Sequence, residues 1–188
     1  DDLVTGVQTC ALPIYAAITK LTNSGIVVVV AAGNSNADAC NYSPARAPSA
    51  ITVGATTIGD VKASYSNFGS CVDIQAPGSE IISTINSGPT ATGSKSGTSM
   101  ATPHVVGAAA VYLGLNPNAS VAQVTQFLDQ ESTKDAISNL PAGTVNKMLY
   151  VSPTDGGPAI VPPTVALKAI DRKSTRLNSS HQIISYAV

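Results

Sequence analysis

A serine stands where the sequence passes from a turn into a long apolar segment. Ser99 follows Gly97 and Thr98 and opens residues 99–115, which are apolar nearly all round and predict a buried helix. The main-chain N–H groups in the first turn of a helix have no partner within the helix. The Ser99 hydroxyl could therefore act as a nucleophile while such an N–H stabilises an oxyanion. A simple helix cap is the alternative interpretation of Ser99.

An uncharged amide is the second candidate. Asn34 comes shortly after residues 26–31, a β-branched run typical of a strand buried on both faces of a parallel sheet. Open α/β sheets bind ligands at the carboxyl ends of their strands. The Asn34 carboxamide could donate an N–H to a ligand there without neutralising a base. A turn residue in a Gly-Asn loop is the alternative.

The elements that must position these side chains alternate between strands and helices. The pattern predicts the end of a helix at residues 16–23 and further strands at 51–54, 72–74 and 80–85. A capping-box pattern at Ser120 precedes an apolar face and predicts another helix. This order indicates an α/β fold with a parallel sheet.

Composition excludes several classes of protein. The chain has 188 residues, 10 Lys and Arg, 11 Asp and Glu, and a formal net charge of −1. It is 44% hydrophobic and only 11% charged, which excludes a disordered chain. Without a basic excess, binding to nucleic acid by bulk electrostatics is not expected. No apolar run approaches the roughly 20 residues that span a bilayer, so no membrane partner is expected.

The two ends differ from the middle. Residues 1–14 and 171–188 resemble translated sequencing-adapter sequence, and we expect both to be non-native. A native polar tail is the alternative for the C-terminal segment. Residues 152–170 are rich in Pro and Gly and predict a linker. Residues 15–151 remain as part of one folded domain.

Residues 26–150 resemble the subtilisin-like serine proteases, most closely the branch that contains proteinase K and aqualysin. The segments that carry the resemblance occur in the family's order, and the longest is residues 96–104, Ser-Gly-Thr-Ser-Met-Ala-Thr-Pro-His; the others are Val-Ala-Ala-Gly-Asn (30–34), Asn-Tyr-Ser-Pro (41–44), Ile-Thr-Val-Gly-Ala (51–55), Tyr-Ser-Asn-Phe-Gly (65–69) and Ala-Pro-Gly (76–78). The resemblance implies the three-layer fold of that family, here expected to be its C-terminal part, truncated at the N-terminus.

The resemblance also assigns roles to residues. It implies that Ser99 is the nucleophile, that Asn34 belongs to the oxyanion hole, and that Ala31, Ala32 and Gly33 form part of the wall of the substrate pocket. It implies no cofactor for catalysis.

The same resemblance leaves the catalytic triad incomplete. The family's chain order is Asp, His, Ser, and the two histidines present, His104 and His181, do not lie in a motif of the expected kind. His104 is five residues after Ser99, about 140° round a helix, so we expect it to point away from Ser99 and to be a packed structural residue. His181 lies in the adapter-like tail. The chain is therefore expected to be inactive alone.

Two structural features are implied as well. The resemblance pairs Cys40 with Cys71 in a disulfide, with two free thiols as the alternative. It places a structural Ca²⁺ on the carboxylate of Asp73 and the carbonyls of Pro48 and Ala50, a chemically suitable set of hard oxygen ligands. An Asp73 carboxylate held by loop amides is the alternative.

The function that follows is that of a secreted, monomeric serine endopeptidase that hydrolyses polypeptides through an acyl-enzyme on Ser99. A non-catalytic interaction module on a protease-like scaffold is the alternative. A lipase would have Gly-x-Ser-x-Gly, whereas this segment ends in Ala101. A nucleotide-binding module would have Gly-x-Gly-x-x-Gly after a strand, which residues 31–36 lack.

Overall fold

The structure is a computed structural model that describes residues 6–151; the predicted linker at 152–170 and the tail at 171–188 lie outside the described residues. Its helices are α1 (Gly6–Asn23), α2 (Thr98–Leu115), α3 (Val121–Glu131) and the short 3₁₀ turn η1 (Ala39–Asn41). Its strands are β1 (Val29–Ala31), β2 (Ile51–Thr56), β3 (Ile74–Pro77), β4 (Ile81–Thr84), β5 (Thr92–Lys95), β6 (Thr133–Lys134) and β7 (Lys147–Met148).

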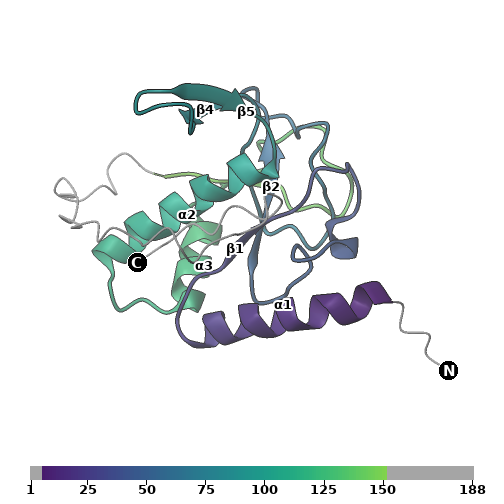
Figure 1. Ribbon diagram of the computed structural model, residues 1–188, viewed down its shortest axis with the longest axis vertical. Helices are drawn as coiled ribbons and strands as arrows, with labels where there is room; N and C mark the ends of the chain where they lie inside the picture. The colour runs from purple at the N-terminus through teal and green to yellow at the C-terminus, as the bar shows by residue number, and fades with distance from the viewer. Residues whose placement is uncertain (1–5, 152–188) are drawn as a thin grey trace.

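A mostly parallel sheet forms the middle layer. Its strand order is β1-β2-β3-β7-β6, and every neighbouring pair is parallel except β6 with β7. Helices α2 and α3 lie on one side of the sheet and α1 on the other (Figure 1). The predicted three-layer α/β fold with a parallel sheet is confirmed.

Small side chains let α2 lie close to the sheet. Val53 and Ala55 on β2 share one buried cluster with Ala101, Val105 and other residues of α2. The capping box predicted at Ser120 is present: the Ser120 hydroxyl accepts from the main-chain N–H of Gln123, whose side chain accepts from the Ser120 N–H. From that start, α3 adds Val124 and Leu128 to the same cluster.

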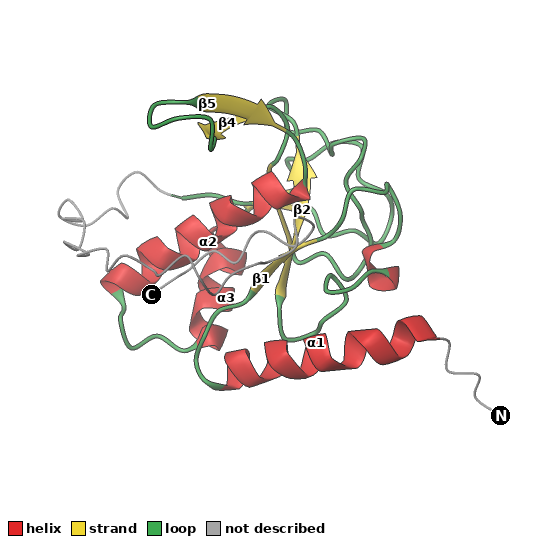
Figure 2. Ribbon diagram, viewed as in Figure 1, coloured by secondary structure: helices red, strands yellow, loops and turns green. Residues whose placement is uncertain are grey.

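The predicted strands differ from the observed ones mainly at their ends. The run at 26–31 gives only three strand residues, and β1 is half-buried because it lies at one edge of the described sheet. The strand expected at 72–74 begins only at Ile74. The one expected at 80–85 is β4, which pairs with β5 in a separate antiparallel hairpin (Figure 2).

Helix α2 is not buried all round, contrary to the prediction. Ala101, Val105 and Ala108 are buried, whereas Pro103 and Gly107 are exposed. The reason is that the sheet and α3 cover only one side of the helix within the described residues. An apolar sequence without an amphipathic pattern does not indicate which of its sides will be covered.

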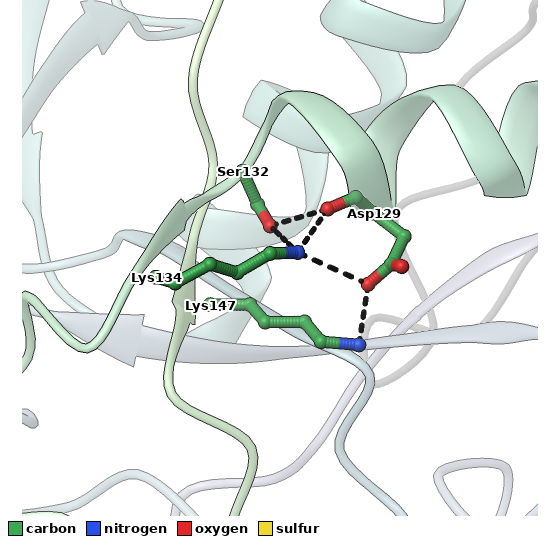
Figure 3. Close-up of polar contacts among 4 residues, drawn as sticks. All are labelled: Asp129, Ser132, Lys134 and Lys147. Atoms are coloured by element: carbon green, nitrogen blue, oxygen red, sulfur yellow. Dashed lines mark hydrogen bonds and ion pairs between the residues drawn. The ribbon is translucent and has the colours of Figure 1, made fainter.

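A polar cluster fastens the end of α3 to β6 and β7 (Figure 3). The ammonium groups of Lys134 and Lys147 both pair with the Asp129 carboxylate, and the Ser132 hydroxyl donates to the Asp129 carbonyl at 2.7 Å. The hydrogen bond from Lys147 is the main cause that lowers the pKa of the Asp129 carboxyl. Because these side chains are largely exposed, each ion pair contributes at most about 1 kcal/mol.

The disulfide between Cys40 and Cys71 is present, so the alternative of two free thiols is wrong. It joins the η1 turn to the loop before β3 across a separation of 31 residues. Both segments lie beside the small buried cluster that contains Ala39 and Val72.

Removing this disulfide should destabilise the protein without altering the fold. Replacing both cysteines (Cys40→Ser with Cys71→Ser) should lower the free energy of unfolding by about 3 to 4 kcal/mol, because the open loop gains chain entropy in the unfolded state. Denaturant unfolding measures the change. Reductant should destabilise the parent protein and leave the double variant unaffected; an equal response of both would contradict the prediction.

A buried amide in β3 has no hydrogen-bond partner among the described residues. The side chain of Gln75 is 1% exposed, and neither its Oε1 nor its Nε2 is paired. It occupies the space left by Gly54 on β2, where a Cβ would lie 2.1 Å from the Gln75 Oε1. Gly54 is therefore needed at this position because Gln75 fills the site of its side chain.

An apolar residue of similar shape should fit this position better. Gln75→Met removes two unpaired polar atoms and should raise the free energy of unfolding by about 1 to 3 kcal/mol. Thermal or denaturant unfolding provides the measurement, with Gln126→Met on the exposed side of α3 as the control. A loss of stability in Gln75→Met alone would mean that a buried water satisfies the amide.

Candidate active site

Ser99 is the second residue of α2 and lies half-buried at the start of the helix. It lines a cleft of about 600 Å³ between the first two turns of α2 and the β4–β5 hairpin. Apolar lining comes from the hairpin segment, with Ile81, Ile82 and Ile85, and from Met100 and Pro103 of α2. A group attached to Ser99 would therefore lie beside an apolar wall and near the unpaired N–H groups of the first helical turn.

Asn34 lies in the loop that follows β1, and two hydrogen bonds orient its carboxamide. Its Oδ1 accepts from the main-chain N–H of Thr98 at 2.9 Å and from the Thr98 hydroxyl at 2.9 Å. Because both donors occupy the oxygen, the Nδ2 group of this exposed side chain is left free to donate. The structure thus brings Asn34 to the residue next to Ser99, although 64 positions separate it from Thr98 in the chain.

Thr98 is a site residue that the sequence analysis missed. Its side chain is fully buried, and its hydroxyl also accepts a hydrogen bond from the main-chain N–H of Gly33 at 3.2 Å. One side chain therefore joins the loop after β1 to the start of α2. The Gly-Thr-Ser sequence marks the position of Thr98, but its partners Gly33 and Asn34 in the loop after β1 cannot be identified from the sequence.

The three residues expected in the pocket wall directly precede Asn34. Ala32 is fully buried, while Ala31 and Gly33 are half-buried. They are not part of the lining of the cleft beside Ser99, which comes from β4, β5 and α2 within residues 6–151. Their assignment to a substrate pocket stays a prediction.

His104 differs from what was expected of it. It is exposed instead of packed, and it lines the same cleft as Ser99. It does make a hydrogen bond, since its Nδ1 lies 2.9 Å from the Met100 carbonyl oxygen. The exposure follows from the one-sided cover of α2, which leaves this side of the helix open.

The residues proposed for calcium do gather in one place. Pro48, Ala50 and Asp73 line a cleft of about 570 Å³ that is closed on another side by Ser120 and Val121 at the start of α3. The Asp73 Oδ2 accepts from the main-chain N–H of Thr52 at 2.7 Å, so the loop-amide contact of the alternative hypothesis exists too.

The Asp73 carboxylate is exposed on one side and surrounded by protein atoms on the others. Lost hydration raises the pKa of its carboxyl, against the lowering effects of the Thr52 hydrogen bond and of the Lys147 charge. Within the described residues, no three His, Cys, Asp or Glu side chains gather closely enough to hold a metal. A cation beside Asp73 would therefore need main-chain oxygens, which Pro48 and Ala50 can supply.

No helix in the described part of the chain combines the length and the apolar character needed to cross a membrane.

The fold and site together define a class: an α/β protein with a serine at the start of its central helix and an oriented amide beside it. Comparison with known proteins is consistent with this class. The profile of the subtilase family matches residues 4–149. The chain belongs to the subtilase family.

The most similar relatives include proteases from bacteria and fungi. The chain is 52% identical over 134 residues to an extracellular serine proteinase of Thermus sp. (strain Rt41A), covering 71% of this chain and 33% of that protein. It is 48% identical over 145 residues to alkaline serine exoprotease A of Vibrio alginolyticus (77% and 26%) and 47% identical over 137 residues to proteinase R of Parengyodontium album (73% and 35%).

A solved structure of a cold-adapted subtilisin-like serine proteinase is also similar. The TM-score is 0.71 with 48% sequence identity, over 74% of this chain and 50% of that one. The chain thus spans about a third of the length of the curated relatives that it matches, and half of the solved structure.

Proposed function

We propose that this chain supplies the nucleophile and one oxyanion-binding group of a serine endopeptidase that hydrolyses polypeptides. The observation that carries the proposal is the pair of hydrogen bonds from Thr98 to the Asn34 Oδ1. These bonds tie the Asn34 Oδ1 to Thr98, the residue before Ser99, and leave the Asn34 Nδ2 group free to donate. Membership of the subtilase family supports the same assignment.

In this mechanism the Ser99 hydroxyl attacks the carbonyl carbon of a peptide bond and its proton passes to a base. The carbonyl oxygen of the tetrahedral intermediate becomes negative and accepts hydrogen bonds from the Asn34 Nδ2 and from the Ser99 main-chain N–H. The base then returns its proton to the leaving nitrogen, and collapse of the intermediate expels the amine and leaves an acyl group on Ser99. Water then attacks this ester and releases the second product.

The base and the acid that orients it are the groups this chain does not provide in the family's arrangement. Its own histidines are His104 and His181, and His104 lies on α2 with its Nδ1 against the Met100 carbonyl. We propose that the triad His and Asp belong to the larger enzyme, and that these 188 residues alone hydrolyse no peptide at a measurable rate.

Secretion and a monomeric state are part of the same proposal. The Cys40–Cys71 disulfide is typical of proteins in oxidising compartments such as the extracellular space. One of the similar proteins is named an extracellular serine proteinase. No cofactor enters the reaction, since each step uses only Ser99, the oxyanion donors and the base.

The central test removes the oxyanion donor from the intact enzyme. Asn34→Ala should lower kcat by roughly 10² to 10³ with little change in KM; this magnitude is the one known for subtilisin, a member of the same family, and is transferred here. Hydrolysis of a chromogenic peptide measures both constants. Ser99→Ala should abolish turnover, and the 188-residue chain alone should show none.

Other results would change the assignment. An unchanged kcat in Asn34→Ala would remove Asn34 from the oxyanion hole. If the intact protein never hydrolyses peptides but binds them, the non-catalytic module is the better description. Turnover by the isolated chain that His104→Ala abolishes would show that the exposed histidine serves as the base.

We also propose that Ca²⁺ binds at Asp73 as a structural ion. The Asp73 carboxylate and the carbonyl oxygens of Pro48 and Ala50 would bind the ion. Its charge would compensate the carboxylate for the hydration it loses on burial. The cleft at Asp73 shares none of its lining residues with the cleft beside Ser99. The ion is therefore expected to stabilise the fold and to take no part in catalysis.

Calcium removal should lower the unfolding temperature of the intact enzyme and leave its initial rate at low temperature nearly unchanged. A free calcium concentration about 100-fold above Kd corresponds to about 2.7 kcal/mol of stabilisation. Asp73→Asn should lose this response, because an amide is a weaker ligand for a hard cation. Thermal unfolding of both proteins with calcium and with chelator decides the point; equal calcium-dependent shifts would favour the loop-amide hypothesis.

A further inference from the structure

Asn67 is a fully buried asparagine, 1% exposed. Among residues 6–151, its side chain bonds only to the loop that carries Asn34. Its Nδ2 donates to the Ala32 carbonyl at 2.8 Å. Its Oδ1 accepts from the main-chain N–H groups of Ser35 at 2.9 Å and Ala37 at 3.1 Å. These contacts fix the main chain on both sides of Asn34.

The fit between Asn67 and this loop is close. The Asn67 main-chain N–H donates to the Gly33 carbonyl at 2.9 Å. A Cβ at Gly33 would lie 2.4 Å from the Asn67 Nδ2. Any side chain at position 33 would therefore clash with the Asn67 side chain in its observed position. Gly33 also has φ +104°, a conformation that other residues rarely adopt.

The loop has a second uncommon main-chain conformation at its far end. Asn36 has φ +48°, and the Lys62 ammonium donates to its Oδ1 at 2.8 Å. Main-chain conformations of this kind persist when surrounding contacts determine them. Gly33 and Asn36 are residue types that tolerate positive φ, and the contacts to Asn67 and Lys62 hold the main chain on both sides of Asn34.

We propose that Asn67 is a positioning residue for the oxyanion-binding amide, an inference that rests on the proposed function of Asn34. Thr98 fixes the orientation of the Asn34 carboxamide, and Asn67 fixes the main chain from which that carboxamide projects. Loss of Asn67 leaves three main-chain groups of the loop without their partner. Asn34 then no longer meets the developing oxyanion at hydrogen-bond distance.

The experiment uses the intact enzyme with Asn67→Ala, and with Asn67→Asp in case the alanine variant does not fold. The aspartate retains the two bonds accepted from Ser35 and Ala37 but replaces the donor to Ala32 with an oxygen. Because a displacement of about 1 Å in a catalytic group can cost 10²-fold, we expect kcat to fall by about 10- to 100-fold in Asn67→Ala, with KM nearly constant.

Asn146→Ala is the matched control. The Asn146 side chain also holds a loop through main-chain contacts, accepting from the Ile137 N–H at 3.0 Å and donating to the Ile137 carbonyl at 2.8 Å. It lies outside the loop that carries Asn34 and should lower the unfolding temperature without lowering kcat. If Asn67→Ala and Asn146→Ala change kcat equally at equal loss of stability, Asn67 has only a structural role and the proposal is overturned.

A double-mutant cycle with Asn34→Ala distinguishes an effect exerted through Asn34 from a general loss of activity caused by a disturbed structure. If Asn67 acts through Asn34, Asn67→Asp should lower kcat in the parent enzyme but have little further effect once Asn34 is alanine. Full additivity would overturn the proposal. Failure of the proposed function gives a different result, because Asn34→Ala alone would then leave kcat unchanged.

Discussion

The two hydrogen bonds that Thr98 donates to Asn34 hold this site together. Asn34 is exposed on a loop and would otherwise have no preferred orientation, whereas Thr98 is fully buried at the start of α2. With its oxygen engaged at 2.9 Å by both donors, the amide can only present its N–H group outward. Every chemical role proposed for Asn34 depends on that orientation. The same two bonds hold Asn34 close to Ser99, because Thr98 is the preceding residue.

Close packing between α2 and the sheet makes this contact possible. The segment between β3 and α2 passes β2 so tightly that a Cβ at Gly78 would lie 2.6 Å from the Ala55 Cβ and 2.9 Å from the Gly97 carbonyl oxygen. Alanines on the buried side of α2 keep the helix near β2. Larger side chains at these positions would move the start of α2 away from the loop after β1.

The proposed stabilising features and the proposed catalytic site lie in different parts of the molecule. The Cys40–Cys71 disulfide, the Asp129 cluster and the cleft around Asp73 lie on connections between strands or at the ends of α3. The cleft at Ser99 is built instead from α2 and the β4–β5 hairpin. The outer connections are therefore cross-linked without contacts to the lining of the cleft at Ser99.

Local sequence determined those features that depend on neighbouring residues. The capping box of Ser120 and Gln123, the central strand that begins at Ile51 and the long helix from Thr98 all follow from short-range patterns, and the structure confirms them. The resemblance carried by residues 96–104 located Ser99. It also gave the Cys40–Cys71 pairing, which spacing alone does not specify.

Tertiary structure decided the features that depend on distant residues. Strands β6 and β7 have two residues each and are too short to carry a pattern. The exposure of His104 reflects which side of α2 is covered. The side-chain hydrogen bonds of Thr98 and Asn67 are with partners at least 30 positions away; the Asn67 amide, for example, bonds to Ala32 across 35 residues. A sequence shows which groups can form hydrogen bonds, but only the packed chain determines which of them meet.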